Sequence, residues 1–177
     1  MEQKVNIWKA NLTNGMILAM VCIVYTLFLY FFDLLFNQTL GYIFLLVQII
    51  LVFFLVKSYR NNFLHGYITY GQAVGAGVII SLYSAVVMAV FSYILYTVID
   101  PGLIAKKLAF VEEMMLKKGV AQATVDTAMK MQEKLQKPLI SSILSIFTGL
   151  FGGTILALII AIFVKKEGNP LLDAPEN

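Results

Sequence analysis

The chain has 177 residues, of which 60% are hydrophobic and only 13% are charged. Soluble globular domains carry about a quarter charged residues, so this composition excludes an ordinary soluble domain. The formal net charge of +3 is small and comes from lysines between the apolar stretches, which argues for membrane orientation and against nucleic-acid binding. The length indicates a single domain covering residues 1–177.

Four uncharged stretches dominate the sequence, and they cover residues 10–32, 40–56, 66–99 and 138–164. Each is long enough to cross the hydrocarbon core of a bilayer, which takes about 20 apolar residues, or about 17 at the short end. We therefore predict an all-α membrane protein with four transmembrane helices at about residues 12–34, 40–56, 73–99 and 139–164. The expected contact partner of these helices is the lipid bilayer.

The first two stretches are bulky and lie close together in the chain. The first follows Lys4 and Lys9 and is too long for the apolar part of a cleaved signal peptide, so we expect a retained helix. About seven residues separate the two stretches, which predicts an antiparallel helical hairpin that suits a lipid-facing position. Cys22, the single cysteine, is expected to be a small buried hydrophobe.

The second connection, residues 57–72, interleaves aromatic residues with basic ones. Rings with a polar edge favour the headgroup layer, so we expect this segment to lie along the membrane interface with a break at Gly66. The favoured interpretation is an interfacial anchor. The alternative is binding of an anionic lipid headgroup or a phosphate group by Lys57, Arg60 and His65. His65 is the single histidine, which argues against a histidine-based metal site within one chain.

Small residues recur every four positions in the last two stretches. Residues four apart share one helix face, and small side chains there let membrane helices approach closely. We therefore predict tight packing of these two spans, either against each other or against a second copy of the chain. The residues concerned are Ala73, Gly77, Ser81, Ala85 and Ala89 in the third span, and Ser141, Ser145, Gly149, Gly153, Ala157 and Ala161 in the fourth.

Residues 100–138 form the one sizeable segment between the apolar stretches. Pro101 and Gly102 end the third span, and a helical pattern of apolar residues then predicts a helix over residues 103–118. Gly119 marks its end, and a second helix is expected to begin at Thr124 as N-cap and to continue to about residue 137. Together they predict an extramembrane helical hairpin, whose apolar faces contain Ile104, Leu108, Val111 and Met115, and Val125, Ala128, Met129, Gln132 and Leu135.

The distribution of lysine and arginine bears on the orientation. Two lysines precede the first span and only Asp33 follows it, and the first span usually dominates topology. These flanks favour a cytoplasmic N-terminus. The third connection opposes this orientation, because it holds seven lysines, whereas the two termini and the second connection together hold six lysines and arginines. We give more weight to the residues that flank the first span than to the total count of basic residues, and we predict that both termini are cytoplasmic.

No acidic or basic residue lies in the middle of any predicted span. Asp33 and Asp100 lie at span ends, where they suit the headgroup layer. Gln48, near the centre of the second span, is interpreted as an interhelical hydrogen-bond partner, with a substrate contact as the alternative. The chain lacks a nucleophile–base pair, the HExxH and CxxC motifs and a phosphate-binding loop, so we expect neither enzymatic activity nor a cofactor.

Several segments resemble a known family over nearly the whole chain. These are the opening IWKANLTNGMIL, the segment KSYRNNFLHGYITYGQAVGAG, the IDPGL exit from the third span and the charged segment before the last span. They are similar to an uncharacterised family of small bacterial membrane proteins, domain of unknown function 4199, found mostly in Bacteroidota. The resemblance implies a multi-pass protein of the bacterial inner membrane with four spans, and it implies no activity.

Three functions remain open from the sequence. The first is a non-enzymatic scaffold or accessory subunit that contacts a second copy or another membrane protein through its packed helices and its outer hairpin. The second is a small oligomeric transporter or channel, which requires a polar path through the spans. The third is a lipid-binding protein that uses the interface formed by Lys57, Arg60 and His65.

Overall fold

The computed structural model describes residues 6–167, so Lys4 lies outside the described residues. Over this range the chain is helical, with six α-helices and one π-helical turn: α1 (Ile7–Phe31), α2 (Gln38–Phe63), α3 (Tyr70–Ile94), η1 (Leu95–Ile99), α4 (Leu103–Lys117), α5 (Gln122–Leu135) and α6 (Pro138–Val164). Four segments are long and apolar enough to cross a membrane, namely α1, α2, α3 with η1, and α6. The prediction of an all-helical protein with four candidate spans is confirmed.

Local sequence explains where the long helices begin. The side chain of Asn6 accepts hydrogen bonds from the backbone amides two and three residues later, at 3.0 and 3.3 Å. Asn37 caps α2 in the same way, and Thr69 with Gln72 forms a capping box at the start of α3. Pro138 occupies the first turn of α6, where its missing N–H has no helical partner to lose.

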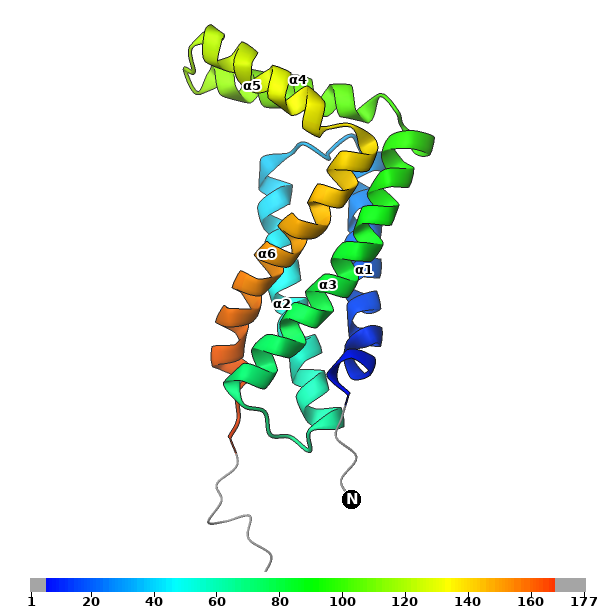
Figure 1. The fold of residues 1–177 in the computed structure, drawn as a ribbon, viewed down its shortest axis with the longest axis vertical. Coiled ribbons are helices and arrows are strands. Elements are labelled where there is room, and N and C mark those ends of the chain that lie inside the picture. The colour runs from blue at the N-terminus through cyan, green and yellow to red at the C-terminus, as the bar shows by residue number, and fades with distance from the viewer. Residues whose placement is uncertain (1–5, 168–177) are drawn as a thin grey trace, which may run out of the picture.

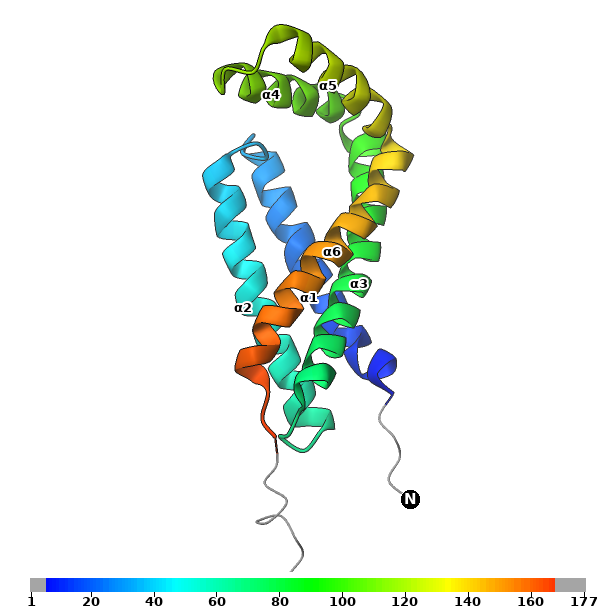
Figure 2. The ribbon, with the colours of Figure 1, turned by 60° about the vertical axis from the view of Figure 1, so that its left-hand side comes forward.

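The long helices form a bundle with α3 at its centre, in contact with α1, α2 and α6. The start of α1, the α2–α3 connection and the end of α6 lie together at one end of this bundle (Figure 1). Helices α4 and α5 pack against each other and lie across the opposite end (Figure 1). Figure 2 shows the α1–α2 pair diverging from the α3–α6 pair towards that end.

The most extensive contact is between α3 and α6, and small residues bring these helices together. A Cβ added at Gly77 would lie 2.7 Å from the Cβ of Ala157, and one added at Gly149 would lie 3.1 Å from the Cβ of Ala85. Gly153 faces Ser81 even more closely. Each step of four residues up α3 thus matches a step of four residues down α6, as expected for antiparallel neighbours. We call these paired residues the small-residue seam.

Helix α1 packs more extensively against α3 than against its sequence neighbour α2, which corrects the expectation of a lipid-facing α1–α2 hairpin. Gly15 is the reason, because an added Cβ there would collide with the Cβ of Tyr83 in α3. Asn14 is also buried, and its Nδ2 donates to the backbone oxygen of Leu55 in α2 at 3.4 Å. The lipid-facing description fits α2, the least buried of the four candidate spans.

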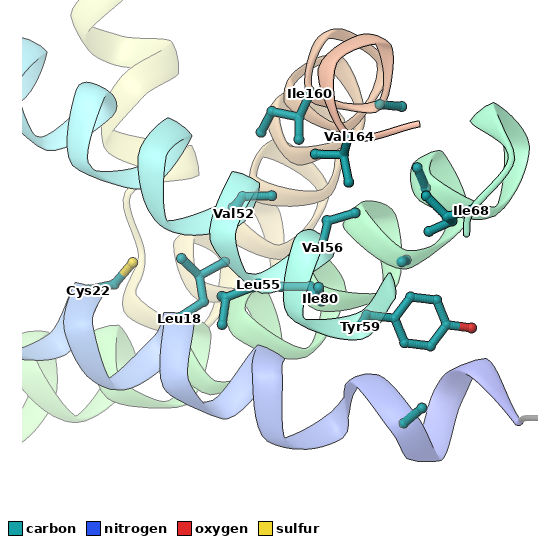
Figure 3. Packing of buried hydrophobic residues seen from close by; sticks show 14 residues of the cluster. Leu18, Cys22, Val52, Leu55, Val56, Tyr59, Ile68, Ile80, Ile160 and Val164 are labelled. Carbon is teal, nitrogen blue, oxygen red and sulfur yellow. The ribbon is translucent and has the colours of Figure 1, made fainter. Parts of the chain in front are cut away.

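One cluster of large buried side chains lies between α2, α6 and the α2–α3 connection (Figure 3). Val52 and Val56 of α2 meet Ile160 and Val164 of α6 there, and Ile68 of the α2–α3 connection closes the cluster. Each of these five side chains is at most 2% exposed. This part of the bundle is therefore a filled apolar core.

The turn between α4 and α5 centres on Gly119, whose φ of 76° suits glycine. The prediction that Thr124 caps the second helix was wrong. Helix α5 begins at Gln122, Ala121 occupies the N-cap position without a side-chain hydrogen bond, and the amide of Thr124 already bonds to the carbonyl of Ala121. The preference of threonine for N-caps is weaker here than the turn geometry set by Gly119.

The seam predicts opposite outcomes for two adjacent glycines. Gly153→Ala places a Cβ against Ser81, so we expect a loss of stability of about 1–3 kcal/mol, the usual cost of overpacking. Gly152→Ala meets nothing within 4 Å and gains helix propensity, so it should be neutral or slightly stabilising. Size-exclusion chromatography of heated, detergent-purified protein measures both changes. Equal heat resistance of the two variants would contradict the seam.

Candidate functional site

Two adjoining cavities lie between the diverging helix pairs, beneath α4 and α5. The larger is about 870 Å³ and is lined by residues from all six α-helices; the smaller is about 650 Å³ and lies between α2, η1 and α4. Both volumes fall within the range of about 300–1,000 Å³ that is typical of ligand sites. Neither cavity is fully enclosed. The divergence visible in Figure 2 therefore leaves real space between the side chains.

Several polar side chains that line the larger cavity belong to the candidate membrane spans. Gln48 Nε2 of α2 donates a hydrogen bond to Cys22 Sγ of α1 at 3.5 Å, and both residues line the cavity wall. Ser81 and Ser84 of α3 are buried in the same wall. Gln48 thus makes an interhelical hydrogen bond and also borders the cavity. This geometry is compatible with both expected roles, the interhelical hydrogen bond and the contact with a bound molecule.

Lys107 of α4 lines both cavities from the side of the α4–α5 pair. Its Nζ donates to Gln136 Oε1 at 3.1 Å and lies 6.0 Å from the centre of the Tyr96 ring. Gln136 Nε2 in turn donates to Gln132 Oε1 at 3.3 Å. Within residues 6–167, Lys107 is the only charged residue among those that line either cavity.

The neighbouring lysine has a different environment. Lys106 Nζ lies 3.2 Å from Asp100 Oδ2, and its side chain is 57% exposed. The hydrogen bond to Asp100, together with the charge of that carboxylate, raises the pKa of Lys106. Lys107 has no carboxylate within ion-pair distance in the described part of the chain, and burial lowers its pKa because the charged form is less well solvated.

The basic residues predicted at the α2–α3 connection lie at the other end of the molecule. Lys57 and Arg60 fall within the last turns of α2, and Arg60 Nη1 donates to the carbonyl oxygen of Val164 at 2.9 Å. Lys57 is half-buried, while His65 is exposed in the connection with a φ of 52°. The guanidinium of Arg60 therefore already binds the end of α6.

A second set of contacts strengthens this attachment. Ile68 and Lys166 exchange two backbone hydrogen bonds, of 2.8 and 2.9 Å. The Nζ of Lys166 also lies 5.3 Å from the centre of the Tyr67 ring. The α2–α3 connection is thereby joined to the residues that follow α6.

Sequence reasoning missed Lys107 and the face of α4 to which it belongs. The residues of α4 that line the cavities are Leu103, Lys107, Phe110, Val111 and Met114. Of the predicted apolar face, Val111 lines the smaller cavity, whereas Ile104, Leu108 and Met115 line neither cavity. The sequence pattern that could have revealed this face is a lysine, Lys107, among apolar residues spaced three or four apart, namely Leu103, Phe110 and Met114.

The polar lining consists of amides, hydroxyls, one thiol and one amine. In the part of the chain that the structure describes, no group of three His, Cys, Asp or Glu residues is placed to hold a metal ion. The arrangement can bind a molecule that is mostly apolar and carries an acceptor group for Lys107.

Comparison with known proteins bears on the family. The family model described as "Protein of unknown function (DUF4199)" matches residues 13–166. The chain belongs to this family. The matched DUF4199 region begins within α1 and includes the other three candidate spans and both helices of the α4–α5 pair. No curated protein and no solved structure matches the chain.

The pKa values of the two adjacent lysines should shift in opposite directions from the ordinary lysine pKa of 10.5, upward for Lys106 and downward for Lys107. Burial disfavours the charged form of Lys107, so its amine should lose a proton at lower pH than the amine of Lys106, which Asp100 holds in the charged form. Carbon NMR of reductively ¹³C-methylated protein follows each amine, with single lysine-to-arginine variants for assignment. The reverse order of titration would exclude the described environment of Lys107.

Proposed function

We propose that this protein is a multi-pass protein of the bacterial inner membrane that acts as a non-enzymatic scaffold or accessory subunit. The observation that supports this role is the α4–α5 pair, which packs chiefly against itself and lies beyond the ends of the candidate spans. Its outward surface includes exposed apolar side chains such as Leu116 and Met131. An extramembrane helical hairpin of this kind suits contact with another protein.

The proposed orientation places both termini in the cytoplasm and the α4–α5 hairpin outside it. The described ends of the chain and the α2–α3 connection lie at the same end of the bundle (Figure 1). Basic residues are present on all three segments at that end, and cytoplasmic loops are enriched in such residues. They include Lys9, Arg60 and Lys165.

The proposed partner is either a second copy of the chain or another membrane protein. The seam residues are used within the chain, between α3 and α6, so a partner needs a different surface. The outward faces of the candidate spans carry large exposed side chains such as Phe147, Phe151 and Phe163, which suit contact with lipid. This leaves the α4–α5 hairpin as the surface for protein contact.

A small oligomeric transporter or channel is the second candidate, and the observation that favours it is the pair of cavities with polar lining. The filled core between α2 and α6 argues against it, because this core closes the other half of the bundle. Lipid binding by Lys57, Arg60 and His65 has less support, since Arg60 is engaged by Val164.

Site-specific photocrosslinking in native membranes tests the scaffold role. A crosslinking residue in place of Met131, exposed on α5, should give protein adducts because the hairpin contacts a partner. The same residue in place of Phe163, exposed on α6, should give mainly lipid adducts. Mass spectrometry identifies the adducts. Protein adducts at position 163 alone would contradict the assignment of the hairpin as the contact surface.

Cysteine labelling tests the orientation. Lys118→Cys, at the end of α4, should react with a membrane-impermeant maleimide in intact spheroplasts. Lys165→Cys, just after α6, should react only after lysis, because it lies at the other end of the bundle. Cys22 is 2% exposed and provides little background. Labelling of position 118 only after lysis would reverse the orientation.

A further inference from the structure

We propose that the two cavities beneath α4 and α5 form a binding site for an amphiphile that has an acyl chain and an anionic headgroup, and that Lys107 contacts the headgroup. This site is independent of the scaffold role, and it is separate from the basic residues at the α2–α3 connection. Its geometry supplies a charge, hydrogen-bonding groups, an apolar channel and access from the bilayer.

Among the described residues, Lys107 has no ion-pair partner. Its ammonium group is half-buried and contacts an amide oxygen and a tyrosine ring, both of which are neutral. A charge in this half-buried position without a counter-ion is less well solvated than in water, and the lowered pKa of Lys107 has the same cause. The nearby carboxylate of Asp100 is engaged by Lys106. An anion at Lys107 would supply the missing counter-charge.

Hydrogen-bonding groups surround the same position. The side chains of Gln132, Gln136 and Ser141 line the larger cavity together with Lys107. An amide nitrogen carries two N–H donors, and Gln136 Nε2 makes one described hydrogen bond, to Gln132 Oε1. Phosphate or carboxylate oxygens placed here would therefore meet both a cation and neutral donors.

The larger cavity continues away from Lys107 along the spans. Its lining on α6 extends from Ser141 to Leu156, and a rise of 1.5 Å per residue makes this distance about 22 Å. One leaflet of the hydrocarbon core is about 15 Å thick, so the cavity has the length needed for an acyl chain. Gly152 lines it and has nothing within 4 Å of the position a Cβ would occupy, which leaves space beside α6.

Access is from the side of the bundle. Leu45 of α2 and Leu144 of α6 both line the larger cavity, and each is 45% exposed. The cavity is not fully enclosed, and these side chains belong to candidate membrane spans, so an opening between α2 and α6 faces the lipid phase. A molecule dissolved in the bilayer thus reaches the cavity without crossing water, which favours an amphiphile over a water-soluble ligand.

The test is lipid binding to the purified full-length protein. The protein is delipidated in a mild non-ionic detergent and titrated with phosphatidylglycerol, oleate or phosphatidylcholine, and bound molecules are counted by native mass spectrometry. We expect saturable binding of one or both anionic amphiphiles, with phosphatidylcholine about tenfold weaker because its choline cation neutralises the charge of its own phosphate. The anionic species that binds more tightly identifies the headgroup as phosphate or carboxylate.

Adjacent lysines provide the matched control. Lys107→Gln should weaken binding of the anionic amphiphile about tenfold, while Lys106→Gln should leave it unchanged because Lys106 is exposed and paired with Asp100. Unchanged binding in Lys107→Gln would overturn the proposal. An equal loss in both variants would also overturn it, since that result indicates attraction by surface charge.

A second pair of variants tests the channel separately from the charge and decides the matter if Lys107→Gln does not fold. Gly152→Leu fills the larger cavity and should reduce binding at least several-fold. Gly71→Leu, at a glycine of α3 that has open space and lies outside both cavities, should not. Equal binding by the two leucine variants would overturn the proposal.

Discussion

The close approach of α3 and α6 is the interaction on which the rest of the structure depends. In a bilayer, apolar helices gain little from leaving lipid, so their association relies on dispersion contacts between closely placed surfaces. Pairs such as Gly77 with Ala157 and Gly153 with Ser81 provide this closeness. Helix α3 then uses a different part of its surface to receive α1 at Gly15, so two of its neighbours are positioned by glycine contacts. Helix α2 has less extensive contacts with each of its neighbours and is the most lipid-exposed span.

The same bundle is filled at one end and hollow at the other, and side-chain size accounts for the difference. Large branched residues such as Val56 and Ile160 meet near the α2–α3 connection and leave little space. Towards α4 and α5, the facing residues of α3 and α6 are serines, alanines and glycines, and the α1–α2 pair diverges from them. The cavities therefore follow from a gradient of residue size along the spans, combined with the tilt of the first two helices.

The four candidate spans were predictable because each is an uninterrupted apolar run, and composition alone identifies such runs. The spacing of small residues in α3 and α6 also indicated two faces suited to close contact. The position of α1 was not predictable, because Gly15 is a single small residue in a bulky helix and its partner Tyr83 is far away in sequence. Lys107 was hidden among seven lysines of one segment, and only the fold distinguishes it from Lys106 by burial and partner. The sequence shows that both residues are lysines, but how well each ammonium group is solvated depends on the residues that the fold packs around it.

The attachment of α6 at its C-terminal end has a mechanical consequence. Hydrogen bonds from Arg60 of α2 and from Ile68 of the α2–α3 connection hold that end in place. The other end of α6 borders the cavities. A helix of 27 residues is a lever about 40 Å long. A pivot of about five degrees at the attached end displaces the far end by roughly 3–4 Å. Because α3 is packed along α6, a rotation of this pair by a few degrees changes the size of the cavities from the end of the bundle that lies farthest from them.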